Sequence, residues 1–209
     1  MRTALIITNG NAPASLPSGL PLENEYVVAV DKGLELCPAL GITPDIAIGD
    51  FDSLEMVSLL DTVESKRYPV DKDYSDTELG IRYAFEKGCD SYVLLGGGEG
   101  RMDHLLAIWS LFPQYGAPKC WITRREANYL VDGKRTFNCS NDETVSILPC
   151  LLAKECHVTV KDLKWPLHHF TIGGGQHMSL SNRCTSGKLE VISDGPVFVT
   201  FLSARENYW

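Results

Sequence analysis

Residues 46–53 read Ile-Ala-Ile-Gly-Asp-Phe-Asp-Ser, a short apolar run that ends at a glycine and is followed by two aspartates. A short, β-branched run bounded by Gly, Asp or Pro is typical of a buried strand. If the backbone stays extended after this strand, Asp50 and Asp52 point the same way, with Phe51 opposite. Two converging carboxylates repel unless a proton or a cation lies between them, and hard oxygen ligands suit Mg²⁺. The stretch therefore predicts either a Mg²⁺ site at a strand end or a solvated turn in which one aspartate caps the next helix.

The same kind of strand recurs through the first two thirds of the chain, with helical patterns in between. Further strands are predicted at Ala4–Thr8, Tyr26–Val30 and Tyr92–Leu95. Ser75-Asp76-Thr77-Glu78 has the pattern of a capping box, which predicts a helix to about Lys87 with Gly88 as its stop. A second helix is predicted at Asp103–Phe112 from its apolar spacing. Alternating strands and helices indicate a Rossmann-like α/β domain with a mainly parallel sheet covered on both faces.

The pattern changes after about residue 133. Short strand-like runs follow one another, separated by turn residues such as Asp194-Gly195-Pro196, and no long helix is evident. These runs are Val145–Leu148, His157–Val160, Met178–Ser181, Leu189–Ile192 and Val197–Phe201. Short strands at regular spacing are typical of a β-sandwich or barrel. We therefore expect an α/β domain at 1–133 and a smaller all-β sandwich domain at 134–209.

Composition narrows the class of protein. The 209 residues are 44% hydrophobic and 22% charged, which is typical of globular proteins, and the net charge of −8 argues against a nucleic-acid binder. Residues 1–133 carry 20 acidic and 11 basic side chains, whereas residues 134–209 carry 7 and 8. The seven cysteines are scattered, without a metal-binding spacing, and no signal peptide or membrane span is evident. We expect a cytoplasmic protein that binds neither membrane nor nucleic acid.

Two further polar clusters follow the first. Residues 71–78, Asp-Lys-Asp-Tyr-Ser-Asp-Thr-Glu, crowd four acids around a lysine, which is either helix capping with surface charge or a site for a metal and a polyphosphate. Residues 95–104, Leu-Gly-Gly-Gly-Glu-Gly-Arg-Met-Asp-His, form a Gly-rich strand-to-helix loop of the kind that lets backbone N–H groups approach phosphate. By itself this loop is a weak signal, because Asp103 could be only a helix cap. The coincidence of several such loops at predicted strand ends, including Asp31-Lys32-Gly33, favours a site for phosphate and metal.

These motifs resemble those of the thiamin pyrophosphokinase (thiamin diphosphokinase) family of the bacterial type. The similar segments are Asp31-Lys32-Gly33, Gly49–Ser53, Lys72–Glu78, Gly100–His104, Leu163–Leu167 and Leu180–Asn182. They follow the family's order across about residues 29–200. Lys32 stands where the family usually has Gly, and Glu99 where a second Gly is common, so the sequence departs from the family pattern at two loops.

The resemblance implies transfer of a pyrophosphoryl group from ATP to the hydroxyethyl group of thiamin, giving thiamin diphosphate and AMP. It implies that Asp50, Asp52 and Asp76 hold Mg²⁺ against the triphosphate. Asp73 and Asp103 are expected close by as further catalytic residues. Expected contacts to ATP and its phosphates come from Asp31, Lys32, Lys72, Gly100, Arg101 and His104. The metal is required in this interpretation, because acidic residues alone would repel ATP.

On the thiamin side the resemblance implies a site that two subunits share. Trp165 is expected to stack on the flat, cationic substrate, with Ser181 and Asn182 as hydrogen-bond partners. From the residues alone, Trp165 is better explained as a half-buried strand aromatic, and it is the resemblance that favours thiamin contact. In the family the β-domain contributes to thiamin binding across a dimer interface, so we expect a homodimer.

Two other functions fit parts of the sequence. A Mg²⁺-dependent phosphohydrolase could use an aspartate of the D-x-D pair as a covalent nucleophile, with release of orthophosphate. A non-catalytic nucleotide-binding sensor would bind ATP without turnover.

Overall fold

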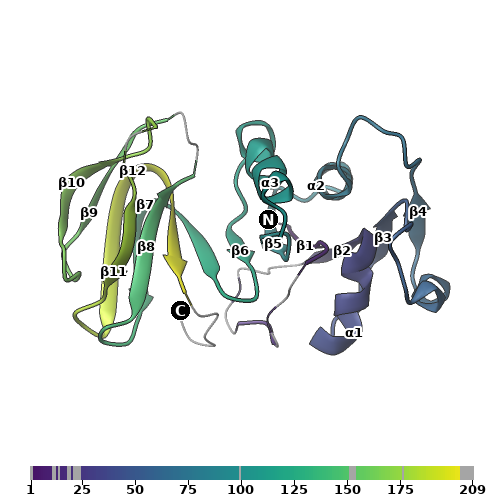
Figure 1. Ribbon diagram of the computed structural model, residues 1–209, viewed down its shortest axis with the longest axis horizontal. Helices are drawn as coiled ribbons and strands as arrows, with labels where there is room; N and C mark the ends of the chain where they lie inside the picture. The colour runs from purple at the N-terminus through teal and green to yellow at the C-terminus, as the bar shows by residue number, and fades with distance from the viewer. Residues whose placement is uncertain are drawn as a thin grey trace. The chain divides into compact units, whose positions relative to one another are not determined.

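The computed structural model describes residues 2–10, 13, 15–17, 20, 25–98, 100–150, 154–175 and 177–202 (Figure 1). The chain forms two compact units, an N-terminal unit of Met1–Leu16 and Leu20–Arg124 and a C-terminal unit of Pro17–Gly19 and Arg125–Trp209. The boundary expected after residue 133 falls inside a strand, β7 (Ala127–Asn138).

The N-terminal unit is built on a parallel sheet. Its strands are β1 (Thr3–Ile7), β2 (Tyr26–Val30), β3 (Ile46–Gly49), β4 (Ser65–Arg67), β5 (Ser91–Leu95) and β6 (Cys120–Ile122). They lie in the order β6-β5-β1-β2-β3-β4, and each neighbouring pair is parallel. The strands predicted from residues 4, 26, 46 and 92 onward are all present. Every residue of β1 and β3 is buried, as expected for strands covered on both faces.

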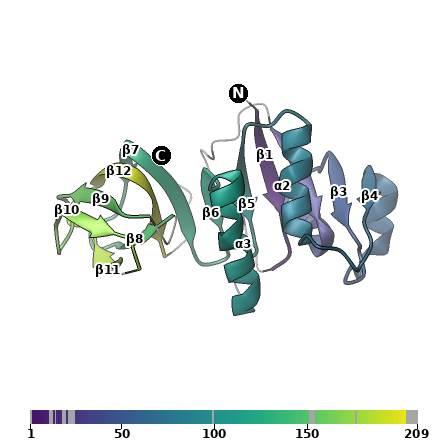
Figure 2. The same cartoon turned by 90° about the horizontal axis from the view of Figure 1, so that it is seen from above.

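Two helices of this unit, at residues 76–86 and 102–115, lie close to where the sequence predicts them, and the other helices were not predicted. They are η1 (Asp31–Glu35), α1 (Leu36–Leu40), η2 (Val57–Thr62), α2 (Asp76–Glu86) and α3 (Met102–Tyr115), where η marks a 3₁₀ helix. Ser75 caps α2 by accepting a hydrogen bond from the Glu78 N–H at 3.2 Å, and Gly88 follows the helix with a φ of 84°. Helix α2 packs on β1, β2 and β3 and lies beside α3 (Figure 2). The predicted helix start at Ser75 is confirmed, although the Glu78 carboxylate accepts from the Tyr115 hydroxyl at 2.8 Å.

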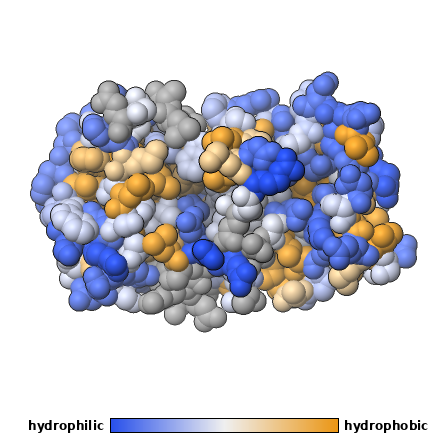
Figure 3. All heavy atoms as spheres, in the orientation of Figure 1, coloured by the Kyte–Doolittle hydropathy of each residue, from blue (hydrophilic) through white to orange (hydrophobic). Residues whose placement is uncertain are grey.

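In its described residues the C-terminal unit is built of strands. It contains β7, β8 (Thr144–Pro149), β9 (Cys156–Val160), β10 (Leu167–Ile172), β11 (Ser179–Arg183) and β12 (Lys188–Phe201). All pairs are antiparallel: β12 pairs with β7, β8 and β9, β10 pairs with β9, and β11 pairs with β8. Tyr129, Phe137 and Phe201 form an aromatic cluster in its core, with ring centroids 5.5 to 6.2 Å apart. A space-filling view shows apolar side chains gathered on part of this unit's surface (Figure 3).

The prediction of two strands separated by a turn at residues 194–196 is wrong. Residues 188–201 form one strand, β12, whose register against β7 shifts between Ser193 and Val197. The Ser193 hydroxyl donates to the Gly195 carbonyl at 2.6 Å. Residues 194–196 therefore form a bulge within the strand and not a turn between two strands. Asp194 accepts from the backbone N–H of His157 at 2.6 Å and lies 2.9 Å from its Nδ1 atom, which ties the bulge to β9.

All seven cysteines are free thiols. Among the described residues, no helix is long and apolar enough to cross a membrane.

Candidate active site

The carboxyl ends of the parallel strands bring the predicted loops to one edge of the sheet. Asp31 follows β2, Asp50 follows β3 and Gly96 follows β5. Val30 of β2 pairs with Ile48 of β3, so the residues that leave these two strands lie next to each other. In open α/β sheets this edge is where ligands bind.

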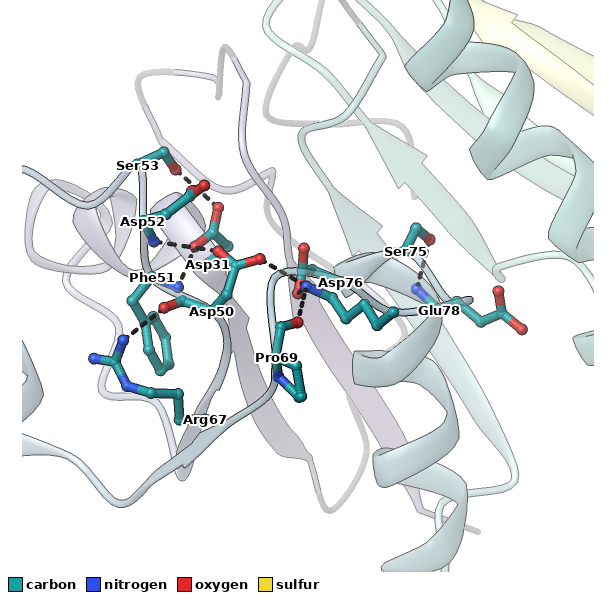
Figure 4. A network of polar contacts seen from close by, with 11 residues as sticks. Asp31, Asp50, Phe51, Asp52, Ser53, Arg67, Pro69, Ser75, Asp76 and Glu78 are labelled. Carbon is teal, nitrogen blue, oxygen red and sulfur yellow. Dashed lines mark hydrogen bonds and ion pairs between the residues drawn. The ribbon is translucent and has the colours of Figure 1, made fainter.

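Three carboxylates converge at the ends of β2 and β3. Asp31, Asp50 and Asp52 each offer an oxygen, and these three atoms all lie within 4.8 Å of one another (Figure 4). We call these three residues the carboxylate cluster. Oxygen donors of this kind fit Mg²⁺, because it is a small, hard cation that usually keeps waters besides its carboxylate ligands. Asp50 and Asp52 were predicted to hold the metal, whereas Asp31 was expected only among the ATP contacts.

The backbone that carries Asp50 and Asp52 does not stay extended after β3. Phe51 adopts a left-handed conformation with a φ of 60°, and its side chain is 6% exposed. Asp31 stabilises this turn: its Oδ1 accepts from the Phe51 N–H at 3.1 Å and its Oδ2 from the Ser53 hydroxyl at 2.8 Å. The Asp52 N–H donates to Asp50 Oδ1 at 3.2 Å. A non-glycine residue in this region is strained and persists only when its surroundings hold it.

Glycine is required at two positions beside the cluster. A Cβ atom on Gly49 would lie 3.1 Å from Cα and Cβ of Asp31, and one on Gly33 would lie 2.3 Å from the Ile7 carbonyl oxygen. Both glycines therefore allow the close approach of backbones on which the cluster depends.

Arg67 was not expected in the site. From the end of β4 its Nη1 donates to the Asp50 carbonyl at 2.7 Å, and its guanidinium carbon lies 5.2 Å from the centroid of the Phe51 ring. It thus holds both the backbone and the side chain of the strained turn. No sequence signal identifies it, because the contact depends on the pairing of β3 with β4.

Lys72 joins the carboxylate cluster to the N-terminus of α2. Its ammonium donates to Asp50 Oδ2 at 2.7 Å and to the Pro69 carbonyl at 3.0 Å. It also lies 3.2 Å from Asp76 Oδ1, in an ion pair rather than a directed hydrogen bond. Asp76, expected among the metal ligands, therefore meets the cluster through the lysine.

The pKa values of Asp50 and Asp76 are shifted in opposite directions. The hydrogen bond from Lys72 lowers the pKa of Asp50, which favours its ionised form. Burial is the main cause that raises the pKa of Asp76, and Lys72 only partly opposes it. Burial by itself lowers the pKa of Lys72, but its contacts with Asp50 and Asp76 outweigh that effect and leave the pKa raised.

The Gly-rich loop after β5 provides backbone freedom and an exposed guanidinium. Gly96, Gly97 and Gly100 have φ values of 89°, 73° and 101°. Arg101 donates to Asp103 through Nε at 3.1 Å, and this pairing lowers the pKa of the Asp103 carboxyl. Glu99, one of the two departures from the family pattern, lies outside the described residues.

The other expected ligands of ATP lie on the surface. His104 is exposed at the start of α3, where its backbone N–H donates to Asp103 Oδ1 at 3.0 Å. Asp73, expected as a further catalytic residue, is exposed before α2. Lys32 pairs with Glu55 and lies 3.9 Å from Glu35, so its charge is directed to neighbouring acids. That pairing with Glu55 is the main cause of the raised pKa of Lys32.

The three residues expected to bind thiamin lie in the C-terminal unit. Trp165 is 56% exposed, whereas tryptophan side chains are highly buried on average. Ser181 is exposed and has a φ of 52°. Asn182 is 2% exposed and exchanges two hydrogen bonds with the main chain of Trp165.

Comparisons with known proteins agree with one another. The model of the thiamin pyrophosphokinase catalytic domain matches residues 20–122, and the model of the vitamin B1 binding domain of the same enzyme matches residues 133–198. A curated relative, thiamine pyrophosphokinase of Bacillus subtilis (strain 168), is 28% identical over 208 residues, covering 87% of this chain and 89% of the relative.

Solved structures share the fold. The thiamin pyrophosphokinase family protein from Enterococcus faecalis has a TM-score of 0.75 and 22% identity, covering 97% of this chain and 99% of that chain. Thiamin pyrophosphokinase from Candida albicans has a TM-score of 0.69 and 15% identity, covering 95% of this chain and 89% of that chain.

Proposed function

The chain belongs to the thiamin pyrophosphokinase family and transfers a pyrophosphoryl group from ATP to thiamin, and we propose that its carboxylate cluster holds the Mg²⁺ that this transfer needs. The observation that carries the proposal is the convergence of Asp31, Asp50 and Asp52 within 4.8 Å at the carboxyl edge of the sheet. Bound there, Mg²⁺ would neutralise the triphosphate and polarise its phosphoryl oxygens.

The remaining steps fall to side chains of this protein. The alcohol of thiamin must meet the β-phosphorus of ATP in line, and catalysis rests on positioning and on neutralising charge. Lys72 lies 2.7 Å from Asp50, so it is positioned to hold a phosphate oxygen next to the cluster. Arg101 is exposed after the Gly-rich loop and can turn from Asp103 to a phosphate. Asp73, Asp76, Asp103 and His104 remain proposed members of this site.

The C-terminal unit is proposed to supply the thiamin contacts. The exposed indole of Trp165 is suited to stack on a flat cation, because the face of an aromatic ring attracts positive charge. Lys164 already places its ammonium 4.8 Å from the centroid of this ring, which supports the use of that face by a cation. The exposed hydroxyl of Ser181 is the proposed polar partner.

We further propose the fold of each unit, the oligomeric state and the cellular setting of the protein. The parallel order of β1 to β6 supports a Rossmann-like catalytic domain, and the antiparallel pairs of β7 to β12 support a β-sandwich. A homodimer would let the C-terminal unit of one subunit complete the site of the other. The free cysteines support a cytoplasmic setting, and the acidic charge supports a protein without a nucleic-acid partner.

Incubation with ATP, Mg²⁺ and thiamin, followed by identification of the products, tests the function. We expect AMP and thiamin diphosphate in equal amounts, and neither when thiamin or Mg²⁺ is left out. Orthophosphate with a phosphoaspartate would instead indicate a phosphohydrolase, and ATP binding without turnover a sensor. Binding of Mn²⁺ in the absence of nucleotide, compared between the wild type and Asp31→Asn, tests the cluster separately from activity.

A further inference from the structure

We propose that Asn182 is a positioning residue, which holds Trp165 in place for thiamin and does not itself contact the substrate. The inference rests on the proposed thiamin site. It differs from the expectation drawn from the sequence, in which Asn182 bonds thiamin directly.

The segment that carries Trp165 is held by main-chain hydrogen bonds on its N-terminal side. Residues 162–165 run antiparallel to residues 182–185: the Thr185 N–H donates to the Asp162 carbonyl at 3.1 Å, and the Lys164 N–H to the Arg183 carbonyl at 2.9 Å. Leu163 and Cys184 form an isolated bridge between these two main-chain bonds. A short ladder of backbone hydrogen bonds therefore fixes the residues just before Trp165.

At Trp165 itself a side chain continues this ladder. Asn182 Oδ1 accepts from the Trp165 N–H at 3.1 Å, and Asn182 Nδ2 donates to the Trp165 carbonyl at 2.8 Å. A carboxamide has the same donor and acceptor as a peptide group, so it can replace one rung. Next to it, Ser181 has a φ of 52°, which departs from the extended backbone that a regular ladder needs.

Both ends of the Asn182 amide are already in use. Its oxygen also accepts from the Arg183 N–H at 2.9 Å, and the side chain is 2% exposed. The N–H groups of Trp165 and Arg183 both point at the same end of the amide, so that end must be the oxygen, and the orientation of the amide is fixed. Such a group is not free to bind a ligand, and breaking its bonds would leave buried polar atoms unpaired.

The main chain of Trp165 is held in place, and its indole is exposed. Pro166 follows Trp165 and restricts its backbone to extended conformations, and Asn182 holds its N–H and carbonyl. The side chain is 56% exposed on this rigid support. A rigid aromatic platform binds a flat ligand with a smaller loss of entropy than a mobile one.

The test is Asn182→Asp, which keeps the acceptor for the Trp165 N–H but removes the donor to its carbonyl. We expect the KM for thiamin to rise about tenfold, while the KM for ATP stays within about twofold of the wild type. Asn128→Asp is the matched control, because Asn128 is a buried asparagine of the same unit that accepts from Thr200 at 2.7 Å. It should leave the KM for thiamin unchanged even if the melting temperature falls.

A double-mutant cycle with Trp165→Ala separates positioning from direct contact. If Asn182 acts through Trp165, Asn182→Asp should have no further effect on thiamin affinity once the indole is gone. An equal effect in both backgrounds, or an equal rise of both KM values, would overturn the inference. If Asn182→Asp does not fold, Asn182→Ser, which removes both amide contacts to Trp165 but keeps a small polar side chain, is tested by the same criteria.

The outcomes distinguish this inference from the proposal on which it rests. If Trp165→Ala leaves the KM for thiamin unchanged, the proposed thiamin site has failed. If Trp165→Ala weakens thiamin binding and Asn182→Asp does not, only the role of Asn182 has failed.

Discussion

Among single residues, Asp50 and Asp52 differ in how firmly they are held. Asp50 has a side chain that is 10% exposed, accepts from Lys72 and has a lowered pKa. Asp52 is exposed, and its backbone N–H donates to Asp50. Asp50 therefore has a structural and an electrostatic role, whereas the carboxylate of Asp52 is open to a metal ion.

Asp52→Asn should reduce kcat by about 100-fold or more while the melting temperature changes little, because it removes one charged oxygen and almost no packing. Asp61→Asn is the control, since Asp61 is an exposed aspartate of the same unit in η2. Turnover with varied Mg²⁺ and thermal melting provide the measurements. Near-wild-type turnover would remove Asp52 from the metal site.

Trp165→Ala should weaken thiamin binding by about 10- to 30-fold and ATP binding by less than about twofold, because a cation–π contact favours only the cationic substrate. The two KM values, measured with the other substrate saturating, check this. Equal effects on both substrates would point to a structural role for the indole.

Among the secondary-structure elements, the close approach of β2 and β3 decides the geometry of the cluster. Gly49 ends β3 with a φ of 155°, and a Cβ atom on it would lie 3.1 Å from Cα and Cβ of Asp31. The approach depends on the absence of a side chain at the strand end, so the glycine matters as much as the carboxylates do.

Gly49→Ala should raise the Mg²⁺ concentration needed for half-maximal activity by at least about tenfold, because the new methyl group would push Asp31 away from Asp50. Gly41→Ala is the matched control: Gly41 also has a positive φ, 65°, but nothing lies within 4 Å of its Cβ position. It should lower stability by about 1 kcal/mol and leave the Mg²⁺ requirement unchanged. If both substitutions raised the Mg²⁺ requirement, the cause would be backbone strain at a positive φ and not the contact with Asp31.

The bulge in β12 gives the C-terminal unit a pH-dependent contact. The backbone hydrogen bond from His157, followed by its side-chain bond, lowers the pKa of Asp194. A carboxyl group with a lowered pKa stabilises the fold above the pKa of the unfolded chain, and this stabilisation is lost as the pH falls through the folded pKa.

The difference in melting temperature between the wild type and Asp194→Asn should therefore be present at about pH 7 and shrink toward about pH 3. Asp132→Asn, at an exposed aspartate of the same unit, should show no such trend. Thermal melts across this pH range provide the test. A difference that stays constant with pH would show that the Asp194 charge does not stabilise the bulge.

For the whole molecule, the two units carry different parts of the proposed chemistry. The carboxylate cluster and Lys72 belong to the N-terminal unit, and Trp165 and Ser181 belong to the C-terminal unit. In a homodimer with shared sites, each reaction centre would combine an N-terminal unit from one subunit with a C-terminal unit from the other.

Mixing Asp52→Asn and Trp165→Ala subunits tests this sharing. After random exchange, half of the dimers are mixed and each has one intact shared site, so about a quarter of wild-type activity should return at low thiamin concentration. Activity before and after subunit exchange is the measurement. If each site is built from one chain, no activity returns.

The local sequence determined much of the fold. The bounds of β2 follow from its short apolar run, and the start of α2 follows from Ser75 and Glu78, because strand burial and helix capping depend on residues close together in the chain. The order of the motifs, from Asp31 to Asn182, was also enough to indicate the family. Predictions were weakest where a local signal had two structural meanings, as at residues 194–196, where turn residues form a bulge.

The tertiary structure decided which of these residues lie together. Asp31 joins Asp50 and Asp52 because Val30 pairs with Ile48, and Arg67 reaches Phe51 because β4 pairs with β3. Asn182 holds Trp165 because two distant segments form a ladder. The sequence by itself determined which chemical groups are present and where strands and helices lie. Which groups converge depends on strand register and backbone approach, and these are set by packing between residues far apart in the chain.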